Sequence, residues 1–192
     1  MQEYRDIVVI AGIPGVGKTT VVEEAVKKLK TYKIVNFGDV MFEIAKSEGL
    51  VKHRDDMRKL SPETQKKIQR HAAKKIAGMA ADSNIIVDTH ISIKTPKGYL
   101  PGLPLWVLEE LEPTKIVIID ATAEEIFLRR KRDNTRRRDD ESLESIKFHQ
   151  RYNIYLAASY SMVSGATVSI VYNKEGKILE AVKELTSILE QD

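Results

Sequence analysis

The feature that most constrains this chain is the stretch VVIAGIPGVGKTTVVEE at residues 8–24. A short apolar run, Val8 to Ala11, leads into a segment with three glycines, and a lysine and two threonines then open a sequence of helical character. Gly12 and the run Gly17 to Thr19 complete the pattern G-x-x-x-x-G-K-T/S, which lies between a strand and a helix. The stretch therefore predicts a phosphate-binding loop at the carboxyl end of a buried strand.

Each part of this loop has an expected role at the phosphates of a nucleotide. Glycines let backbone N–H groups converge on phosphate oxygens, and the dipole of the following helix adds positive potential. We expect Lys18 to reach the β- and γ-phosphates and the Thr19 hydroxyl to bind Mg²⁺. The residues predicted to hold the phosphates of MgATP are Gly12, Ile13, Pro14, Gly15, Val16, Gly17, Lys18, Thr19 and Thr20.

Five apolar runs predict the strands of a sheet. They are nearly continuous rather than alternating, as expected for strands that helices cover on both faces. Helical patterns lie between them; in one, Ser61 and Pro62 look like an N-cap and a first helical position before an apolar stripe. The alternation predicts an α/β fold of three layers, with a central five-stranded, mostly parallel sheet and helices on both faces. The predicted strands are residues 7–12, 32–37, 84–89, 115–120 and 166–172.

Length and composition narrow the class of protein. A chain of 192 residues with 42% hydrophobic side chains is long enough for a sizeable core, and we expect one domain over residues 1–192. No apolar span is long enough to cross a membrane, and the start MQEYRD lacks the pattern of a secretory signal. The absence of cysteine excludes a thiolate metal site and fits a reducing compartment. We therefore expect a cytoplasmic protein with no membrane partner.

Two intervals depart from the regular alternation of strands and helices. Residues 38–83 are too long for one crossover helix, and KGYLPGLP at residues 97–104 is predicted to be a loop rich in glycine and proline. Insertions after strand ends are where substrates bind in open α/β sheets. These intervals therefore predict the site of a second substrate.

Polar residues at two strand ends are candidates for the metal and acceptor sites. Asp88 ends the third predicted strand, and we favour a role at the metal over a role as a turn cap. Asp120 is a rival, but its place before Ala121 and Thr122 favours an N-terminal helix cap. His90 follows Asp88 closely and either touches an acceptor phosphate or forms a hydrogen bond within the loop.

Basic residues gather in one segment of the chain. RRKRDNTRRR, residues 129–138, has seven basic residues and one acidic residue, whereas the formal net charge of the whole chain is only +3. The rest of the chain is thus net negative, and we do not expect a nucleic-acid partner, because nucleic-acid-binding proteins more often spread basic charge over a face or arm.

The arginines of this segment suit a transferring phosphoryl group. Guanidinium groups bind phosphate oxygens in a bidentate way, and the charge of such a group lies on its equatorial oxygens. We interpret Arg129, Arg130 and Lys131 as solvated residues or RNA contacts. The predicted catalytic clamps are Arg132, Arg136, Arg138 and Arg151. No base is evident, which suits an acceptor phosphate that is already ionised, and no N-K-x-D guanine reader follows a later strand.

Several stretches together resemble one family. IAGIPGVGKTT, VNFGDVMFEIAKSEGL, DDMRKLSPETQKKIQ, IIVDTH, KTPKGYLPGLPLWVLEEL and DNTRRRDD are similar to the archaeal type of adenylate kinase, and the resemblance covers nearly the whole chain. It implies a P-loop kinase fold, Mg²⁺-dependent conversion of ATP and AMP to two ADP, and a homotrimer. It also implies an AMP-binding insertion at about 38–83 and a short arginine-rich lid at about 131–142.

The chain departs from the motifs of bacterial and eukaryotic adenylate kinases. Those enzymes read T-G-D with an arginine three residues later, and D-G-F-P-R, whereas this chain reads FGDVMF from Phe37 and DTHIS from Asp88. Two arginines that would hold the AMP phosphate are thus absent. The AMP residues implied are Phe37, Gly38, Arg58, His90 and Lys94, with Arg54 as an alternative that also fits a solvated helix face. Residues 95–103 are expected to wall the AMP site, and 173–176 to border the ATP adenine.

Two alternative functions remain open at the level of the sequence. One is a kinase for another nucleoside monophosphate, such as CMP, UMP or dTMP. The other is an adenylate-kinase-like ATPase that aids ribosome assembly, in which the basic segment would contact RNA.

Overall fold

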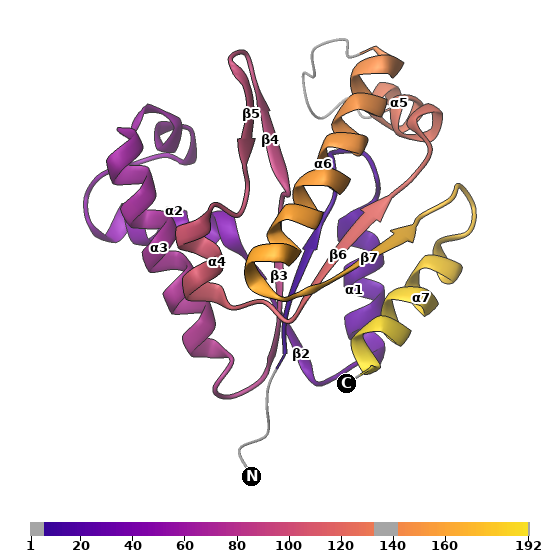
Figure 1. Cartoon of the computed structure of the whole chain (residues 1–192), viewed down its shortest axis with the longest axis horizontal. Helices are drawn as coiled ribbons and strands as arrows, with labels where there is room; N and C mark the ends of the chain where they lie inside the picture. The colour runs from indigo at the N-terminus through magenta and orange to yellow at the C-terminus, as the bar shows by residue number, and fades with distance from the viewer. Residues whose placement is uncertain (1–5, 133–141, 192) are drawn as a thin grey trace.

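The computed structural model describes residues 6–132 and 142–191. Its centre is a five-stranded sheet with the order β2-β3-β1-β6-β7, in which every neighbouring pair is parallel (Figure 1). The strands are β1 (Ile7–Ala11), β2 (Tyr32–Asn36), β3 (Asn84–Thr89), β6 (Lys115–Asp120) and β7 (Thr167–Tyr172). The predicted parallel sheet is confirmed, and each strand lies within its predicted range.

The central strand β1 is buried along its whole length. Its register places Ile10 beside Asp88 of β3, and Ala11 beside Thr89. Because the carboxyl ends of parallel strands meet at one edge of a sheet, the loop after β1 emerges next to the last residues of β3. The sheet thus positions the phosphate loop and the candidate metal residue side by side.

Helices cover both faces of the sheet, as the continuous apolar strands predicted. The helices are α1 (Lys18–Lys28), α2 (Phe37–Ser47), η1 (Arg54–Lys59, a 3₁₀ helix), α3 (Pro62–Met79), α4 (Leu105–Leu111), α5 (Ala123–Arg132), α6 (Leu143–Ser164) and α7 (Ile178–Glu190). One apolar core packs α1 and α7 on one face, and a second core packs α2, α3 and α4 on the other. Figure 1 shows these layers on either side of the sheet. Within the described residues, no helix is long and apolar enough to cross a membrane.

The interval 38–83 holds more than one crossover helix, as its length indicated. It contains most of α2, the short helix η1 and all of α3. The hydroxyl of Ser61 accepts the N–H of Thr64 at 3.2 Å and Pro62 opens α3, so the predicted helix start is confirmed.

The stretch 97–104 is not an irregular loop, and this prediction was wrong. Residues Gly98–Pro101 form β5, which pairs in antiparallel fashion with β4 (Ser92–Thr95) in a separate two-stranded hairpin. The turn is short, and the Thr95 hydroxyl donates to the Gly98 carbonyl at 2.8 Å. Two short strands around a Pro-Lys turn ending in glycine are a hairpin signal, which the glycine and proline content obscured.

Candidate active site

The phosphate loop runs from the end of β1 directly into α1. Gly17 is the N-cap residue of α1 and has φ 82°, a left-handed conformation that glycine adopts without strain. A Cβ atom at this position would collide with the side-chain amide of Asn173. Helix α1 begins at Lys18. At its amino end, backbone N–H groups without helical partners and the helix dipole favour binding of an anion.

Lys18 forms an ion pair with Asp88. The ammonium group contacts Asp88 Oδ1, and the two side chains are 12% and 20% exposed. The second carboxylate oxygen, Oδ2, accepts a hydrogen bond from the Asn36 side-chain amide at 3.1 Å. The structure thus brings the predicted lysine and aspartate together at the carboxyl edge of the sheet, and it adds Asn36, which the sequence analysis did not identify.

Burial shapes the charge of Lys18. Removal from water lowers the pKa of Lys18 to about 8, whereas the Asp88 carboxylate beside it favours the charged form. A largely buried lysine that is paired with one carboxylate, as Lys18 is with Asp88, suits a site that binds a further anion such as a phosphate group.

His90 lies at the same loop. Burial and the charge of Lys18 lower the pKa of His90 below its ordinary value, and the Gly12 backbone opposes this shift in part. By accessible surface the residue is exposed, so nearby protein atoms rather than enclosure cause the desolvation. Both predicted roles, a hydrogen bond within the loop and contact with an acceptor phosphate, stay predictions.

Thr19 and Asp88 provide oxygen donors for the predicted Mg²⁺. Thr19 lies in the first turn of α1, beside the residue that pairs with Asp88. Among the described residues, no group of three or more histidine, cysteine, aspartate or glutamate side chains is arranged to hold a metal. Mg²⁺ in phosphotransfer sites uses one or two protein oxygens together with substrate phosphates and water. The donor set therefore fits Mg²⁺ that arrives with a nucleotide.

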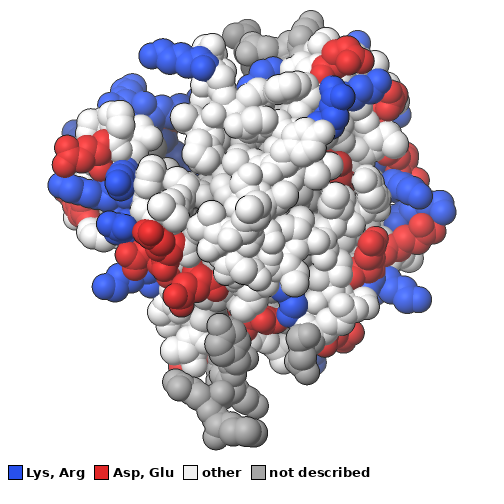
Figure 2. Space-filling model, viewed as in Figure 1, with Lys and Arg blue, Asp and Glu red and all other residues white. Residues whose placement is uncertain are grey.

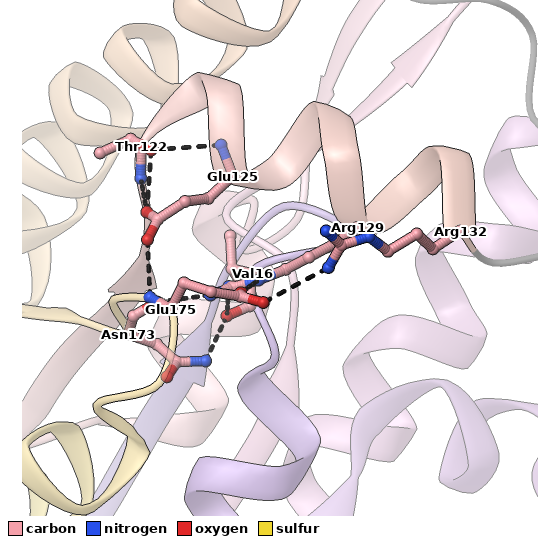
Figure 3. Close-up of polar contacts among 7 residues, drawn as sticks. All are labelled: Val16, Thr122, Glu125, Arg129, Arg132, Asn173 and Glu175. Carbon is pink, nitrogen blue, oxygen red and sulfur yellow. Dashed lines mark hydrogen bonds and ion pairs between the residues drawn. The ribbon is translucent and has the colours of Figure 1, made fainter.

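A polar network joins α5 to the phosphate loop and to the turn after β7 (Figure 3). Arg129 donates to the carbonyls of Val16 at 3.2 Å and Asn173 at 3.0 Å. Its Nε also donates to Glu175 at 3.0 Å, and the side chain is only 19% exposed. The interpretation of Arg129 as a solvated residue or RNA contact was wrong, because its donor groups are used inside the protein.

The neighbouring arginines also reach toward this region. Arg130 donates from Nε to the Pro14 carbonyl at 2.7 Å, so its interpretation as a purely solvated residue was also wrong. Arg132 lies at the end of α5, exposed, and its guanidinium is 3.4 Å from Glu175. Arg136 and Arg138, like most of the predicted lid, lie outside the described residues.

Arg151 lies elsewhere. It is on α6 and lines an open cavity of about 480 Å³ together with Asp120, Thr122 and Lys147, and no phosphate-loop residue lines this cavity. Its predicted role as a clamp is therefore without support from the geometry and stays a prediction.

Asp120 does not cap α5, contrary to the sequence analysis. Its carboxylate accepts the Ala121 N–H at 2.9 Å and the Gln150 amide at 2.6 Å. Thr122 supplies the cap instead, because its hydroxyl accepts the N–H of Glu125 at 3.2 Å and the Glu125 carboxylate accepts the Thr122 N–H at 2.8 Å.

The candidate acceptor residues lie on several elements. Phe37, buried, and Gly38 form the first turn of α2, which follows β2 without a loop. Arg54 pairs with Asp39, and a Cβ atom on Gly38 would lie 2.7 Å from an Arg54 nitrogen. Arg54 thus lies against the amino end of α2, and its side chain is 57% exposed, in keeping with the interpretation as a solvated helix face.

The remaining acceptor candidates lie away from this turn. Arg58 is on η1 and is exposed. Lys94 is on β4 and donates to the Ser145 hydroxyl at 2.7 Å, which links the hairpin to α6. Neither the exposure of Arg58 nor the contact of Lys94 identifies the AMP phosphate site, so both assignments stay predictions.

The hairpin is anchored on α6 by buried polar groups. Ser92 at the start of β4 is 3.0 Å from His149 Nε2 and donates to Asn153, and all three residues are buried. The Tyr160 hydroxyl donates to the Ile91 carbonyl at 2.8 Å and accepts the Leu103 N–H at 3.2 Å. The hairpin is therefore held at its base, beside His90, and projects from the sheet (Figure 1).

Comparison with solved structures supports the fold. A shikimate kinase from Bacteroides thetaiotaomicron aligns with a TM-score of 0.59 at 13% identity, covering 97% of this chain and 99% of that one. A shikimate kinase from Acinetobacter baumannii in complex with shikimate also has a TM-score of 0.59, at 16% identity, over 98% and 94% of the two chains. These likenesses show the three-layer P-loop kinase fold.

Comparison with sequences shows the family. A family model described as an AAA domain matches residues 11–147. The adenylate kinase of Methanocaldococcus jannaschii is 57% identical over 187 residues, which are 95% of this chain and 97% of the relative. That of Methanothermobacter thermautotrophicus is 56% identical over 184 residues, 96% and 99% of the two chains. Because these identities extend over nearly the full length, the chain belongs to the archaeal adenylate kinase family.

Proposed function

We propose that this chain transfers the γ-phosphoryl group of ATP to AMP, reversibly and with Mg²⁺, to give two molecules of ADP. The observation that carries the proposal is the buried Lys18–Asp88 pair beneath a phosphate loop that opens a helix. The two relatives that match this chain over nearly their whole length are both named adenylate kinase. Family and site geometry thus support the same reaction.

On the donor side, the chain binds and orients the triphosphate. The backbone N–H groups between Gly12 and Thr20, other than at Pro14, which has none, donate to the phosphate oxygens, and Lys18 turns from Asp88 toward the β- and γ-phosphates. Thr19 and Asp88 would hold Mg²⁺, which would supply positive charge to the phosphate groups. Catalysis on this side is positioning and electrostatic stabilisation.

On the acceptor side, the chain orients AMP and needs no general base. The attacking oxygen belongs to a phosphate that is already ionised at neutral pH. We assign the acceptor to the space bordered by the first turn of α2, His90 and the β4–β5 hairpin. Arg54 joins Arg58 and Lys94 as a candidate for the AMP phosphate, because its guanidinium lies against the amino end of α2.

Cationic clamps complete the proposed mechanism. Arg132 stands at the carboxyl end of α5 and pairs weakly with an exposed carboxylate, Glu175, that a phosphate oxygen can displace. Arg136 and Arg138 keep their predicted role in the short lid. Surrounding the phosphoryl group with guanidinium groups stabilises its charge and keeps water from competing.

Measurement of ADP formation tests this function directly. The purified chain is incubated with ATP, Mg²⁺ and in turn AMP, CMP, UMP, dTMP or no acceptor. We expect fast ADP formation with AMP and only slow hydrolysis when water is the sole acceptor. Faster transfer to another monophosphate would make the chain a kinase for that nucleotide, and hydrolysis that ignores every acceptor would overturn the proposal.

We further propose that the chain assembles as a homotrimer through the outer face of α6. Phe148, Tyr155 and Met162 follow one another at helical spacing on this helix and are 50%, 69% and 90% exposed. Figure 2 shows few charged side chains over the centre of this face. An exposed apolar stripe of this kind is typical of a contact between subunits.

The oligomeric state can be measured by sedimentation equilibrium. Met162→Glu should convert a trimer to monomers, because it would bury a charge in the contact. Leu179→Glu, at a residue of α7 that is 72% exposed, is the matched control and should leave the trimer intact. A wild-type monomer would refute the assembly. A cytoplasmic location remains a prediction from the cysteine-free composition.

A further inference from the structure

The side chain of Asn36 makes two hydrogen bonds in opposite directions. Its carbonyl oxygen accepts the backbone N–H of Asp39 at 3.1 Å, which caps the amino end of α2. Its amide nitrogen donates to Asp88 Oδ2 at 3.1 Å. Because one planar amide carries both groups, the position of each partner restricts the other.

The sheet register explains why this bridge forms. Asn36 is the last residue of β2 and is paired with Asp88 in the parallel β2–β3 ladder. The chain enters α2 at the next residue, Phe37, without an intervening loop. A side chain at this junction can therefore reach both the neighbouring strand and the first turn of the helix.

The two oxygens of Asp88 are thereby given different partners. Oδ1 contacts the Lys18 ammonium, and Oδ2 accepts from Asn36. A carboxylate that is held on one oxygen by a neutral amide has a restricted side-chain orientation and presents its other oxygen in a fixed direction. The direction of the oxygen beside Lys18 thus depends on the Asn36 amide.

The side-chain oxygen of Asn36 lies at the first turn of α2, on the proposed acceptor side. A Cβ atom on Gly38 would lie 3.3 Å from Asn36 Oδ1 and 2.7 Å from the Arg54 guanidinium, which is paired with Asp39. Asn36 is thus in contact with the turn that carries the candidate acceptor residues. A continuous set of contacts runs from Lys18 through Asp88 and Asn36 to this turn.

We propose that Asn36 is a positioning residue that fixes the donor-side carboxylate Asp88 and the acceptor-side end of α2 in one arrangement. The inference rests on the proposed function, which assigns Asp88 to the MgATP site and α2 to the AMP site. Asn36 itself touches no reacting atom. It aligns the two substrates by holding the groups that bind them.

Two substitutions separate this role from simple helix capping. Asn36→Ser keeps an oxygen that can cap α2 but removes the amide donor to Asp88, whereas Asn36→Ala removes both groups. Asn36→Ala should lower the melting temperature by about 2–4 °C through loss of the cap. Asn36→Ser should melt close to the wild type, yet both variants should lose about 10- to 100-fold in kcat, the usual effect of removing such a supporting group.

A binding measurement reports on Asp88 without turnover. Mn²⁺ replaces Mg²⁺, and its affinity for the complex of the protein with the non-hydrolysable analogue AMP-PNP is followed by electron paramagnetic resonance. Asn36→Ser should weaken Mn²⁺ binding by about tenfold or more. In an Asp88→Asn background the same substitution should have no further effect, because the carboxylate that it positions is absent.

Ser61→Ala is the matched control. Ser61 caps α3 in the same way, through the N–H of Thr64, but has no link to Asp88. It should lower the melting temperature as Asn36→Ala does and leave kcat and Mn²⁺ affinity unchanged.

The outcomes distinguish the inference from the function on which it rests. Wild-type kcat and Mn²⁺ affinity in Asn36→Ser would reduce Asn36 to a helix cap and overturn the inference while leaving the kinase assignment intact. A wild-type protein that forms no ADP from ATP and AMP would overturn the proposed function, and the Mn²⁺ titration would still test the link to Asp88.

Discussion

Arg129 and Asn173 donate hydrogen bonds to the same acceptor, the backbone carbonyl of Val16, at 3.2 and 2.8 Å. Arg129 is on α5, 113 residues after Val16 in the sequence, and Asn173 is in the turn after β7, 157 residues after Val16. Val16 precedes Gly17, where the chain turns with positive φ into α1. Two distant elements therefore fix the end of the phosphate loop.

Asn173→Ala should destabilise the protein and weaken ATP binding. The Asn173 side chain is buried, and its removal deletes one of the two hydrogen bonds to the Val16 carbonyl; loss of a typical hydrogen bond costs about 0.5–1.5 kcal/mol. Thermal unfolding and the KM for ATP measure the two effects. Lys183→Ala, at an exposed residue of α7, is the control. An unchanged KM in Asn173→Ala would show that the loop does not depend on this amide.

Gly17→Ala should abolish nucleotide binding. The substitution adds backbone strain at φ 82° and a collision with the Asn173 amide. Gly49→Ala is the matched control, because Gly49 has φ 71° and a Cβ atom there would meet nothing within 4 Å. Strain alone should cost about 1–3 kcal/mol at either position. Equal losses of stability and full ATP binding in both variants, by calorimetry, would contradict the close approach of Asn173.

Lys18→Ala should reduce ADP formation by about 10²–10³-fold or more, because a buried cation that stabilises transition-state charge is removed. Folding should survive, since the aspartate left behind retains the hydrogen bond from Asn36. Initial rates and circular dichroism provide the comparison. Lys28→Ala, an exposed residue at the other end of α1, should behave as the wild type. Near-normal turnover without Lys18 would refute its assignment.

His90 should make the protein less stable in mild acid. Its folded-state pKa lies below the ordinary value of 6.5, because burial and the nearby Lys18 charge disfavour the protonated ring. The unfolded chain then binds more protons in this range, so the contribution of His90 is complete above about pH 6.5 and is lost as the pH falls toward the folded pKa. His90→Gln should flatten the melting temperature between pH 5 and pH 7; identical slopes would be evidence against this shift.

The sequence analysis was correct for features that depend on residues close together in the sequence. The phosphate loop, the Ser61–Pro62 helix start and the five strands of the sheet depend on residues a few positions apart, whose spacing is visible in the chain. The position of Asp88 next to the phosphate loop also followed, because parallel strands align their carboxyl ends, whereas its ion pair with Lys18 was found only in the structure.

It failed where a residue of ordinary appearance has a distant partner. Arg129 was assigned to solvent because its neighbours in sequence are basic, but its acceptors come from other elements. Asn36 has no motif that marks it, and its role follows from the register between β2 and β3. The hairpin over 92–101 depends on buried contacts with α6, more than 50 residues later.

By itself, the sequence therefore determined the chemistry that this chain can perform: a phosphate loop, an alternation of strands and helices that indicates a parallel sheet, and the residues that mark the family. Tertiary structure decided which side chains hold that loop and how the donor and acceptor sides are joined. The physical reason is that a motif records contacts along the backbone, whereas hydrogen bonds such as those to Val16 and Asp88 form only when packing brings remote segments together.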